Sequence, residues 1–226
     1  MSTFTTRRGA RLDFTTLGFG SATFGNLERV YSEDECDATM TAAWDSGARY
    51  FDTAPLYGLG LSELRVGRGL AGRDGFLLST KVGRVLVPGE PNGGIYVGTP
   101  RVRYVYDYSR DGVLRSFEDS LKRLGRDKVD ILFVHDVDAP AHGGRDGSEA
   151  RIRELMETGG WRALDELRGS GVVKAIGLGV NEWQPCARML ELADPDLFLL
   201  AGRYTLLEQE PIETLFPQCA KAAPAS

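Results

Sequence analysis

Residues 129–180 read VDILFVHDVDAPAHGGRDGSEARIRELMETGGWRALDELRGSGVVKAIGLGV, and they set the fold class. The runs 129–134 and 172–180 are apolar at almost every position, which is typical of strands buried on both faces. Residues 150–168, between these runs, have the apolar periodicity of an amphipathic helix. A strand, a helix and a second strand in this order predict two parallel strands joined by a helical crossover.

The same alternation continues on both sides of this unit. Ser32 is a predicted N-cap, with Glu35 three residues later completing a capping box. The expected strands are residues 17–22, 49–51, 75–80, 129–134, 172–180 and 197–200. The expected helices are residues 32–47, 61–70, 109–124, 150–168, 183–192 and 211–219.

Two architectures fit a parallel sheet covered by helices. A doubly wound sheet usually carries a G-x-G-x-x-G turn after its first strand, and Gly18, Gly20 and Gly25 do not have that spacing. We therefore predict an α/β fold of the (β/α)8 TIM-barrel type, built as a single domain over residues 1–226. Six of the eight strand-helix units can be counted, and residues 220–226 have no strand character. An open sheet, or completion by another chain, would also explain six units, but we expect a domain that is incomplete at its C-terminus.

Composition restricts the class of protein. The 226 residues are 42% hydrophobic and carry a formal net charge of −5, which disfavours nucleic acid and anionic membranes as partners. No apolar run approaches the length of a membrane span or of a signal peptide, so we expect a cytoplasmic protein. The three cysteines, Cys36, Cys186 and Cys219, lack the spacing of zinc or disulfide frameworks, and no metal is expected.

Polar residues follow several of the predicted strands. Asp52, Lys81, His135 and Asn181 come directly after apolar runs, and Tyr57 lies five residues past Asp52. In a β/α barrel, groups beyond the carboxyl ends of the strands converge on one rim, where active sites lie. Taken singly, each of these residues would be read as the first solvated residue of a loop. Together they form a chemically coherent set.

The set suits acid-base chemistry at a tyrosine. A phenol with a pKa of about 10 exchanges a proton near neutrality only when a neighbouring cation stabilises its phenolate. Lys81 can supply that charge, Asp52 can hold Lys81 in place, and His135 can orient a substrate oxygen. Lowering the pKa of Tyr57 by about three units would require about 4 kcal/mol of differential interaction.

Six segments resemble the motifs of the aldo-keto reductase family, in the same order along the chain. The most specific is Phe51-Asp-Thr-Ala-Pro-Leu-Tyr-Gly. The others are Leu17-Gly-Phe-Gly-Ser-Ala, Ser79-Thr-Lys-Val-Gly, Ser120-Leu-Lys-Arg-Leu-Gly, Asp130-Ile-Leu-Phe-Val-His and Ala175-Ile-Gly-Leu-Gly-Val-Asn. Within the family, the chain is most similar to the aldose 1-dehydrogenase branch, which includes fucose or galactose dehydrogenases and pyridoxal 4-dehydrogenase. Segments such as His135-Asp-Val-Asp and Val180-Asn-Glu-Trp carry that narrower resemblance.

The resemblance implies a catalytic tetrad of Asp52, Tyr57, Lys81 and His135, with Tyr57 as the general acid or base. It implies direct hydride transfer between a non-covalently bound NADP or NAD and an aldose or similar aldehyde, ketone or alcohol. Asn181, Gly20 and Ser21 are the expected cofactor-binding residues. Where the family has Ser-Asn after its fifth strand, this chain has Val180-Asn181, and Ala201 replaces a common Gln. The seventh and eighth units, which hold much of the dinucleotide, have no counterpart here, so the cofactor site is expected to be incomplete.

Two further expectations concern loops and assembly. Residues 83–108 form a long predicted loop with four tyrosines, read either as a functional lid or as a disordered loop with aromatics on the rim. His142 and residues 143–147 are read as plain surface loop. As an alternative to a working enzyme, the chain would be a catalytically impaired family member that self-associates through its open sheet edges or acts as an interaction module.

Overall fold

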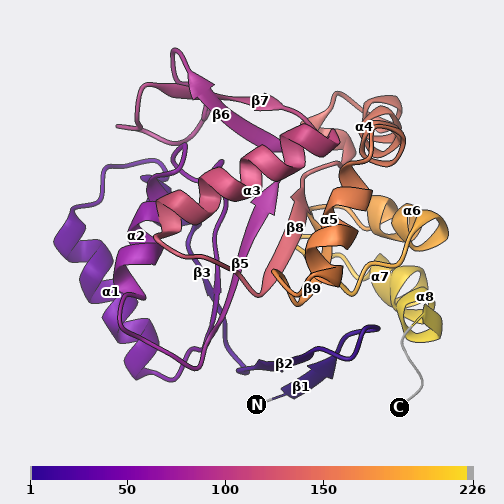
Figure 1. Cartoon of the computed structure of the whole chain (residues 1–226), viewed down its shortest axis with the longest axis horizontal. Helices are drawn as coiled ribbons and strands as arrows, with labels where there is room; N and C mark the ends of the chain where they lie inside the picture. Colours follow the sequence, from indigo (N-terminus) through magenta and orange to yellow (C-terminus); the bar gives the residue numbers. More distant parts are fainter. Residues whose placement is uncertain (1, 223–226) are drawn as a thin grey trace.

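The computed structural model describes residues 2–222, and its centre is a curled sheet of six parallel strands (Figure 1). Their spatial order is β10-β9-β8-β5-β4-β3, so sequence neighbours within the sheet lie side by side. The strands are β3 (Phe19–Gly20), β4 (Tyr50–Asp52), β5 (Leu77–Val82), β8 (Ile131–His135), β9 (Ala175–Val180) and β10 (Leu197–Leu200). Every residue of β5, β8 and β9 is buried. The predicted six-unit barrel type is confirmed.

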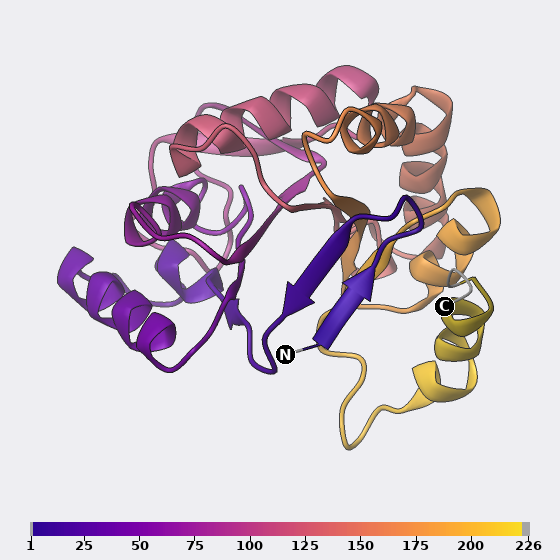
Figure 2. The ribbon, with the colours of Figure 1, turned by 60° about the horizontal axis from the view of Figure 1, so that its bottom comes forward.

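Helices surround the outer face of this sheet (Figure 2). Ser32 caps the first of them: its hydroxyl accepts from the Glu35 amide at 3.2 Å, while the Glu35 carboxylate accepts from the Ser32 amide at 2.8 Å. This reciprocal arrangement satisfies two backbone donors that the first turn would otherwise leave free. The helices are α1 (Glu33–Asp45), α2 (Leu61–Gly69), α3 (Arg110–Leu124), α4 (Arg145–Glu157), α5 (Gly160–Gly169), α6 (Gln184–Leu192), α7 (Glu210–Glu213) and α8 (Leu215–Ala222).

The helix predicted over residues 150–168 is in fact two helices. Thr158 ends α4, and Gly159 follows with a φ of +84°, a left-handed conformation that interrupts the α-helix. Helix α4 also begins earlier than expected, at Arg145, so residues 145–147 are helical rather than surface loop. The prediction failed because the apolar period continues across the break, although the backbone turns there.

Residues 83–108 are likewise not a structureless loop. They contain the antiparallel hairpin of β6 (Arg84–Pro88) and β7 (Val102–Tyr106), with Arg84 paired to Tyr106 and Pro88 to Val102. Beyond the hairpin, an isolated bridge joins Tyr96 to Leu27. The interpretation of this segment as disordered is wrong. The pairing of β6 with β7 and the bridge from Tyr96 to Leu27 hold it in a defined conformation over the carboxyl ends of the sheet.

A second hairpin closes the opposite end of the curled sheet. Strands β1 (Ser2–Thr5) and β2 (Arg11–Phe14) pair antiparallel and lie across the amino ends of the parallel strands, in front in Figure 2. Leu12 of β2 is fully buried and forms an inner core with Leu77, Ile131, Phe133 and Ala175. The inside of the curve is therefore filled by side chains at this end.

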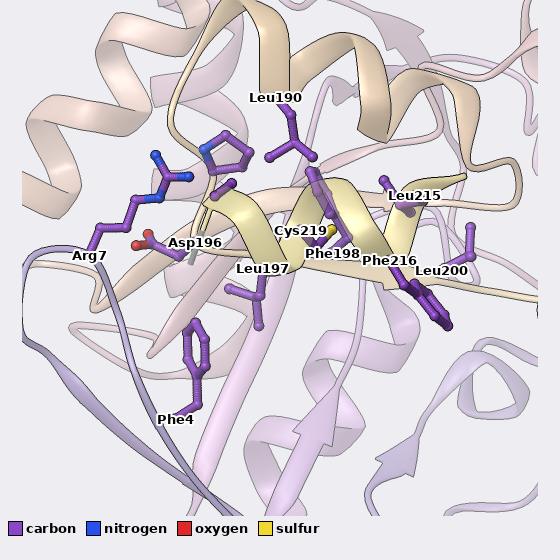
Figure 3. Close-up of a pocket in the computed structure, with 12 residues that line it drawn as sticks. Phe4, Arg7, Leu190, Asp196, Leu197, Phe198, Leu200, Leu215, Phe216 and Cys219 are labelled. Atoms are coloured by element: carbon purple, nitrogen blue, oxygen red, sulfur yellow. The ribbon is translucent and has the colours of Figure 1, made fainter. Parts of the chain in front are cut away.

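An apolar cavity of about 270 Å³ lies at the β10 edge of the sheet, far from the polar residues singled out above. Phe198 and Leu215 point into it from β10 and α8, and Phe4 closes it from the hairpin of β1 and β2 (Figure 3). No helix in residues 2–222 has both the length and the apolar character needed to cross a membrane.

Candidate active site

The alternation of side chains along each strand places the polar residues on the inside of the curled sheet. Successive side chains of a strand point to opposite faces. Leu77 belongs to the inner core and Leu78 to the outer one, so Lys81, four residues after Leu77, points inward. The same count from Ile131 turns His135 inward. Asp52 ends β4 beside them, paired in register with Ser79. These three side chains thus meet above the apolar inner core, at the carboxyl end of the sheet.

Lys81 is the centre of the site. Its Nζ donates to Asp52 Oδ2 at 2.6 Å, to the Thr53 carbonyl oxygen at 2.8 Å and to the Tyr57 hydroxyl at 3.1 Å. Ser79 donates to the other oxygen of Asp52 at 2.6 Å. Burial by itself lowers the pKa of Lys81, but Asp52 and Tyr57 oppose it, and the net shift is upward. The ammonium is therefore held in its charged form beside the phenol.

Tyr57 lies on a loop that packs tightly against the segment after β3. A Cβ placed on Gly25 would lie 2.3 Å from the Gly58 backbone nitrogen, so only glycine permits this approach. Burial raises the pKa of Tyr57, while Lys81 opposes the rise. The predicted lowering of the Tyr57 pKa by Lys81 is therefore not the net effect, because desolvation of the phenolate outweighs the attraction of the ammonium.

His135 completes the group. Its ring centroid lies 5.8 Å from that of Tyr57, with the two planes nearly perpendicular. The residue is buried, and the pKa of its imidazole is lowered well below the usual value by burial first and by Arg84 and Lys81 next. The ring is therefore neutral near pH 7 and presents one donor and one acceptor nitrogen.

The residues predicted to contact a dinucleotide have different environments. Asn181 is exposed after β9, and its side-chain Nδ2 donates to Asp136 Oδ1 at 3.3 Å. Gly20 is exposed at the end of β3, and a Cβ there would meet no atom within 4 Å. Ser21 is fully buried, and its hydroxyl lies 2.7 Å from the Asp52 carbonyl oxygen and 2.8 Å from Ser62 Oγ. The exposed amide and the open backbone fit the nicotinamide end of a dinucleotide, whereas Ser21 offers no free side chain to it.

Three residues near the tetrad were not predicted. Arg84 of β6 forms an ion pair with Asp136, from its Nη2 to Oδ2 at 2.9 Å. Tyr96 lies over Tyr57, with ring centroids 6.2 Å apart. Asp136 directly follows His135 in a segment that also carries the narrower family resemblance. Tyr96 is one of the four tyrosines in the segment interpreted as a lid or a loop on the rim, whereas nothing local to Arg84 indicated its contact with Asp136.

The chain is similar to known proteins along almost its entire length. A model of the "Aldo/keto reductase family" matches residues 16–223. A pyridoxal 4-dehydrogenase from Microbacterium luteolum is 43% identical over 93% of this chain and 65% of its own length. A D-threo-aldose 1-dehydrogenase from a Pseudomonas species is 40% identical over 95% of this chain and 64% of its own. The chain thus spans just under two thirds of the length of these two relatives.

The fold also matches solved structures. The holo form of an aldo-keto reductase from Bacillus halodurans superposes with a TM-score of 0.72 and 25% sequence identity. The match covers 98% of this chain and 63% of that one. The likeness therefore includes nearly all the described elements of the curled sheet and its helices.

Proposed function

Because the chain belongs to the aldo/keto reductase family, we propose that it acts as a nicotinamide-dependent oxidoreductase on an aldose or a similar carbonyl-alcohol pair. The contact that carries this proposal is the 3.1 Å hydrogen bond from Lys81 Nζ to the Tyr57 hydroxyl, within a cluster that includes Asp52 and His135. The names of the two relatives support the substrate class. We further propose that residues 1–226 form one domain of this family.

In the proposed reduction, the Tyr57 hydroxyl gives its proton to the carbonyl oxygen, and in oxidation the phenolate takes the proton back. The phenolate left after reduction faces the ammonium of Lys81 at hydrogen-bonding distance, which stabilises its charge. Asp52 keeps that ammonium in place. Neutral His135 donates a hydrogen bond to the substrate oxygen and so fixes its position next to Tyr57.

A bound NADP or NAD would supply or take up the hydride. Of the residues described, Asn181 would hold the carboxamide of the nicotinamide, and the backbone near Gly20 would leave space for the ring. The described residues suggest no preference between NADP and NAD. With either cofactor, Lys81 would keep its hydrogen bond to Tyr57, and Tyr57 would face the substrate oxygen.

The test is Tyr57→Phe, which removes the hydroxyl and keeps the ring. We expect kcat for a hydroxylated aldehyde, followed at 340 nm, to fall by about 10²- to 10⁴-fold, the usual contribution of a general acid. Cofactor affinity, measured by fluorescence titration, should stay within threefold. Tyr204→Phe, at a tyrosine that is half exposed and outside the tetrad, is the matched control and should leave kcat unchanged. An unaltered kcat in Tyr57→Phe would remove Tyr57 from this role.

A second candidate function is self-association by a catalytically impaired chain. Its support is apolar surface near the β10 edge, where Leu206 and Leu207 are each 95% exposed. Sedimentation velocity over a hundredfold range of protein concentration tests it, with Leu206→Ser/Leu207→Ser as the comparison. A concentration-dependent oligomer that dissociates in this variant supports the idea. A monodisperse monomer that also turns over a carbonyl substrate contradicts it.

A further inference from the structure

Asp136 occupies an unusual backbone position beside the tetrad. Its φ is +43°, in the left-handed region that residues with a Cβ rarely adopt. The backbone is held there from two sides: the Asp136 amide donates to the Gly179 carbonyl at 2.9 Å, and its own carbonyl lies 2.8 Å from His142 Nε2. Aspartate adopts this conformation more readily than most residues with a Cβ, so the turn permits Asp136, and its role follows from the contacts of its carboxylate.

The carboxylate of Asp136 is surrounded by donors. Arg84 Nη2 lies 2.9 Å from Oδ2, His135 Nε2 lies 3.5 Å from the same oxygen, and Asn181 Nδ2 lies 3.3 Å from Oδ1. Two carboxylate oxygens offer about four lone-pair positions, and the contacts at hydrogen-bonding geometry occupy only part of them. The side chain is 16% exposed, in contrast to the almost fully buried Arg84, so it retains an accessible surface.

Arg84 holds the carboxylate in place. Burial raises the pKa of Asp136, and the Arg84 guanidinium opposes that rise. This guanidinium is buried beside the rings of Tyr104 and Tyr106, with Cζ 5.3 and 5.1 Å from their centroids, and its Nε and Nη1 have no hydrogen-bond partner among the described residues. Such a buried cation is costly to maintain, and a buried ion pair is weak evidence for a role in stability. The arrangement is better explained by a function for the anion it holds.

The position of that anion indicates the function. His135 is the residue that would bind the reacting oxygen, and Asp136 presents its carboxylate 3.5 Å from the Nε2 of that imidazole. A carboxylate here can only accept hydrogen bonds, so it suits a substrate that carries a hydroxyl close to the reacting carbon. A plain aldehyde would leave the remaining acceptor positions of the carboxylate unfilled and partly dehydrated.

We propose that Asp136, held by Arg84, accepts a hydrogen bond from a substrate hydroxyl adjacent to the reacting carbon and thereby selects hydroxylated carbonyl compounds over plain ones. The inference rests on the proposed oxidoreductase function and adds a specificity-determining residue to it. Sites that hydrogen-bond a substrate hydroxyl reject analogues lacking it far more strongly than apolar pockets reject a missing methylene.

The experiment compares two three-carbon aldehydes, glyceraldehyde and propionaldehyde, in NADPH- and NADH-dependent reduction by the whole chain. We expect the wild type to favour glyceraldehyde in kcat/KM by at least 100-fold. Asp136→Leu should lower that preference at least 10-fold. Arg84→Met/Asp136→Leu removes both charges together and should show the same loss, even if Asp136→Leu folds poorly because Arg84 is left unpaired. Asp119→Asn, an acidic residue on α3 remote from the site, is the matched control and should keep the preference.

A binding measurement separates this inference from the proposed function. The chain has two histidines, so the imidazole signal of His135 can be assigned by NMR and followed during titration with glycerol and propan-1-ol. Weaker glycerol binding in the double variant, with propan-1-ol binding unaffected, supports the proposal. This holds even if the chain reduces neither aldehyde, because a lack of turnover contradicts only the oxidoreductase function. A substrate preference or glycerol affinity that both variants retain, or wild-type glycerol binding no tighter than that of propan-1-ol, would overturn it.

Discussion

Replacing Lys81 with methionine should destabilise the fold by about 3 to 5 kcal/mol, because it leaves a buried carboxylate without its counter-charge. Lys81 is 2% exposed and the side chain of Asp52 is 11% exposed, so water cannot take the place of the ammonium. The change also removes the donor to the Thr53 carbonyl, a contact of 2.8 Å. Methionine has a similar length, so the loss reflects charge and hydrogen bonding more than a cavity.

The double variant Asp52→Asn/Lys81→Met removes both charges and tests the physical cause. Replacing a buried ion pair by neutral groups of similar volume is often close to neutral, so we expect the double variant to lie within about 2 kcal/mol of the wild type. Lys122→Met is the control, because Lys122 is 73% exposed and its pair with Asp119 should contribute less than about 1 kcal/mol.

The assay is urea unfolding followed by the fluorescence of the three tryptophans, with the free energy of unfolding extrapolated to water. Equal slopes against urea would show that the variants unfold a similar surface. The reasoning is refuted if Lys81→Met costs less than about 1 kcal/mol, or if the double variant is as unstable as Lys81→Met.

Two other perturbations probe burial and packing. The pKa of His135 is depressed by burial, so the unfolded chain binds a proton that the folded chain does not, and stability should fall as the pH drops below about 6.5. Urea titrations from pH 7.5 to 5.0 should show a smaller loss of unfolding free energy for His135→Gln than for the wild type. Burial also lowers the pKa of His142, which contributes in the same direction in both proteins. Equal pH profiles for wild type and variant would contradict this account. Gly177→Ala would place a Cβ 1.8 Å from the Leu197 carbonyl oxygen, so β10 must separate from β9. Amide exchange across residues 197–200 should then rise at least tenfold, and unchanged protection would show that the edge can adapt.

Local pattern carried most of the fold. The buried runs and helical periods predicted the six parallel strands, and the capping box at Ser32 formed as expected, because both depend on neighbours within one turn or one strand. The same limitation explains the errors. A left-handed Gly159 broke the helix predicted over residues 150–168, and the hairpin of β6 and β7 formed through pairing between strands that lie 13 residues apart.

In the candidate site too, local sequence predicted some features, and others depended on tertiary contacts. Side chains alternate along a strand, and parallel strands end at one rim. The positions of Asp52, Lys81 and His135 at the ends of strands were therefore enough to predict that they share one face. The contact of Tyr57 with Lys81 depended on how one loop docks against Gly25, and the pairing of Arg84 with Asp136 depended on a hairpin folding over that rim. Burial likewise raised the pKa of Tyr57, against the expectation from Lys81 alone. Contacts and desolvation of this kind are properties of the folded chain, because they depend on distances between segments that no periodicity along the sequence encodes.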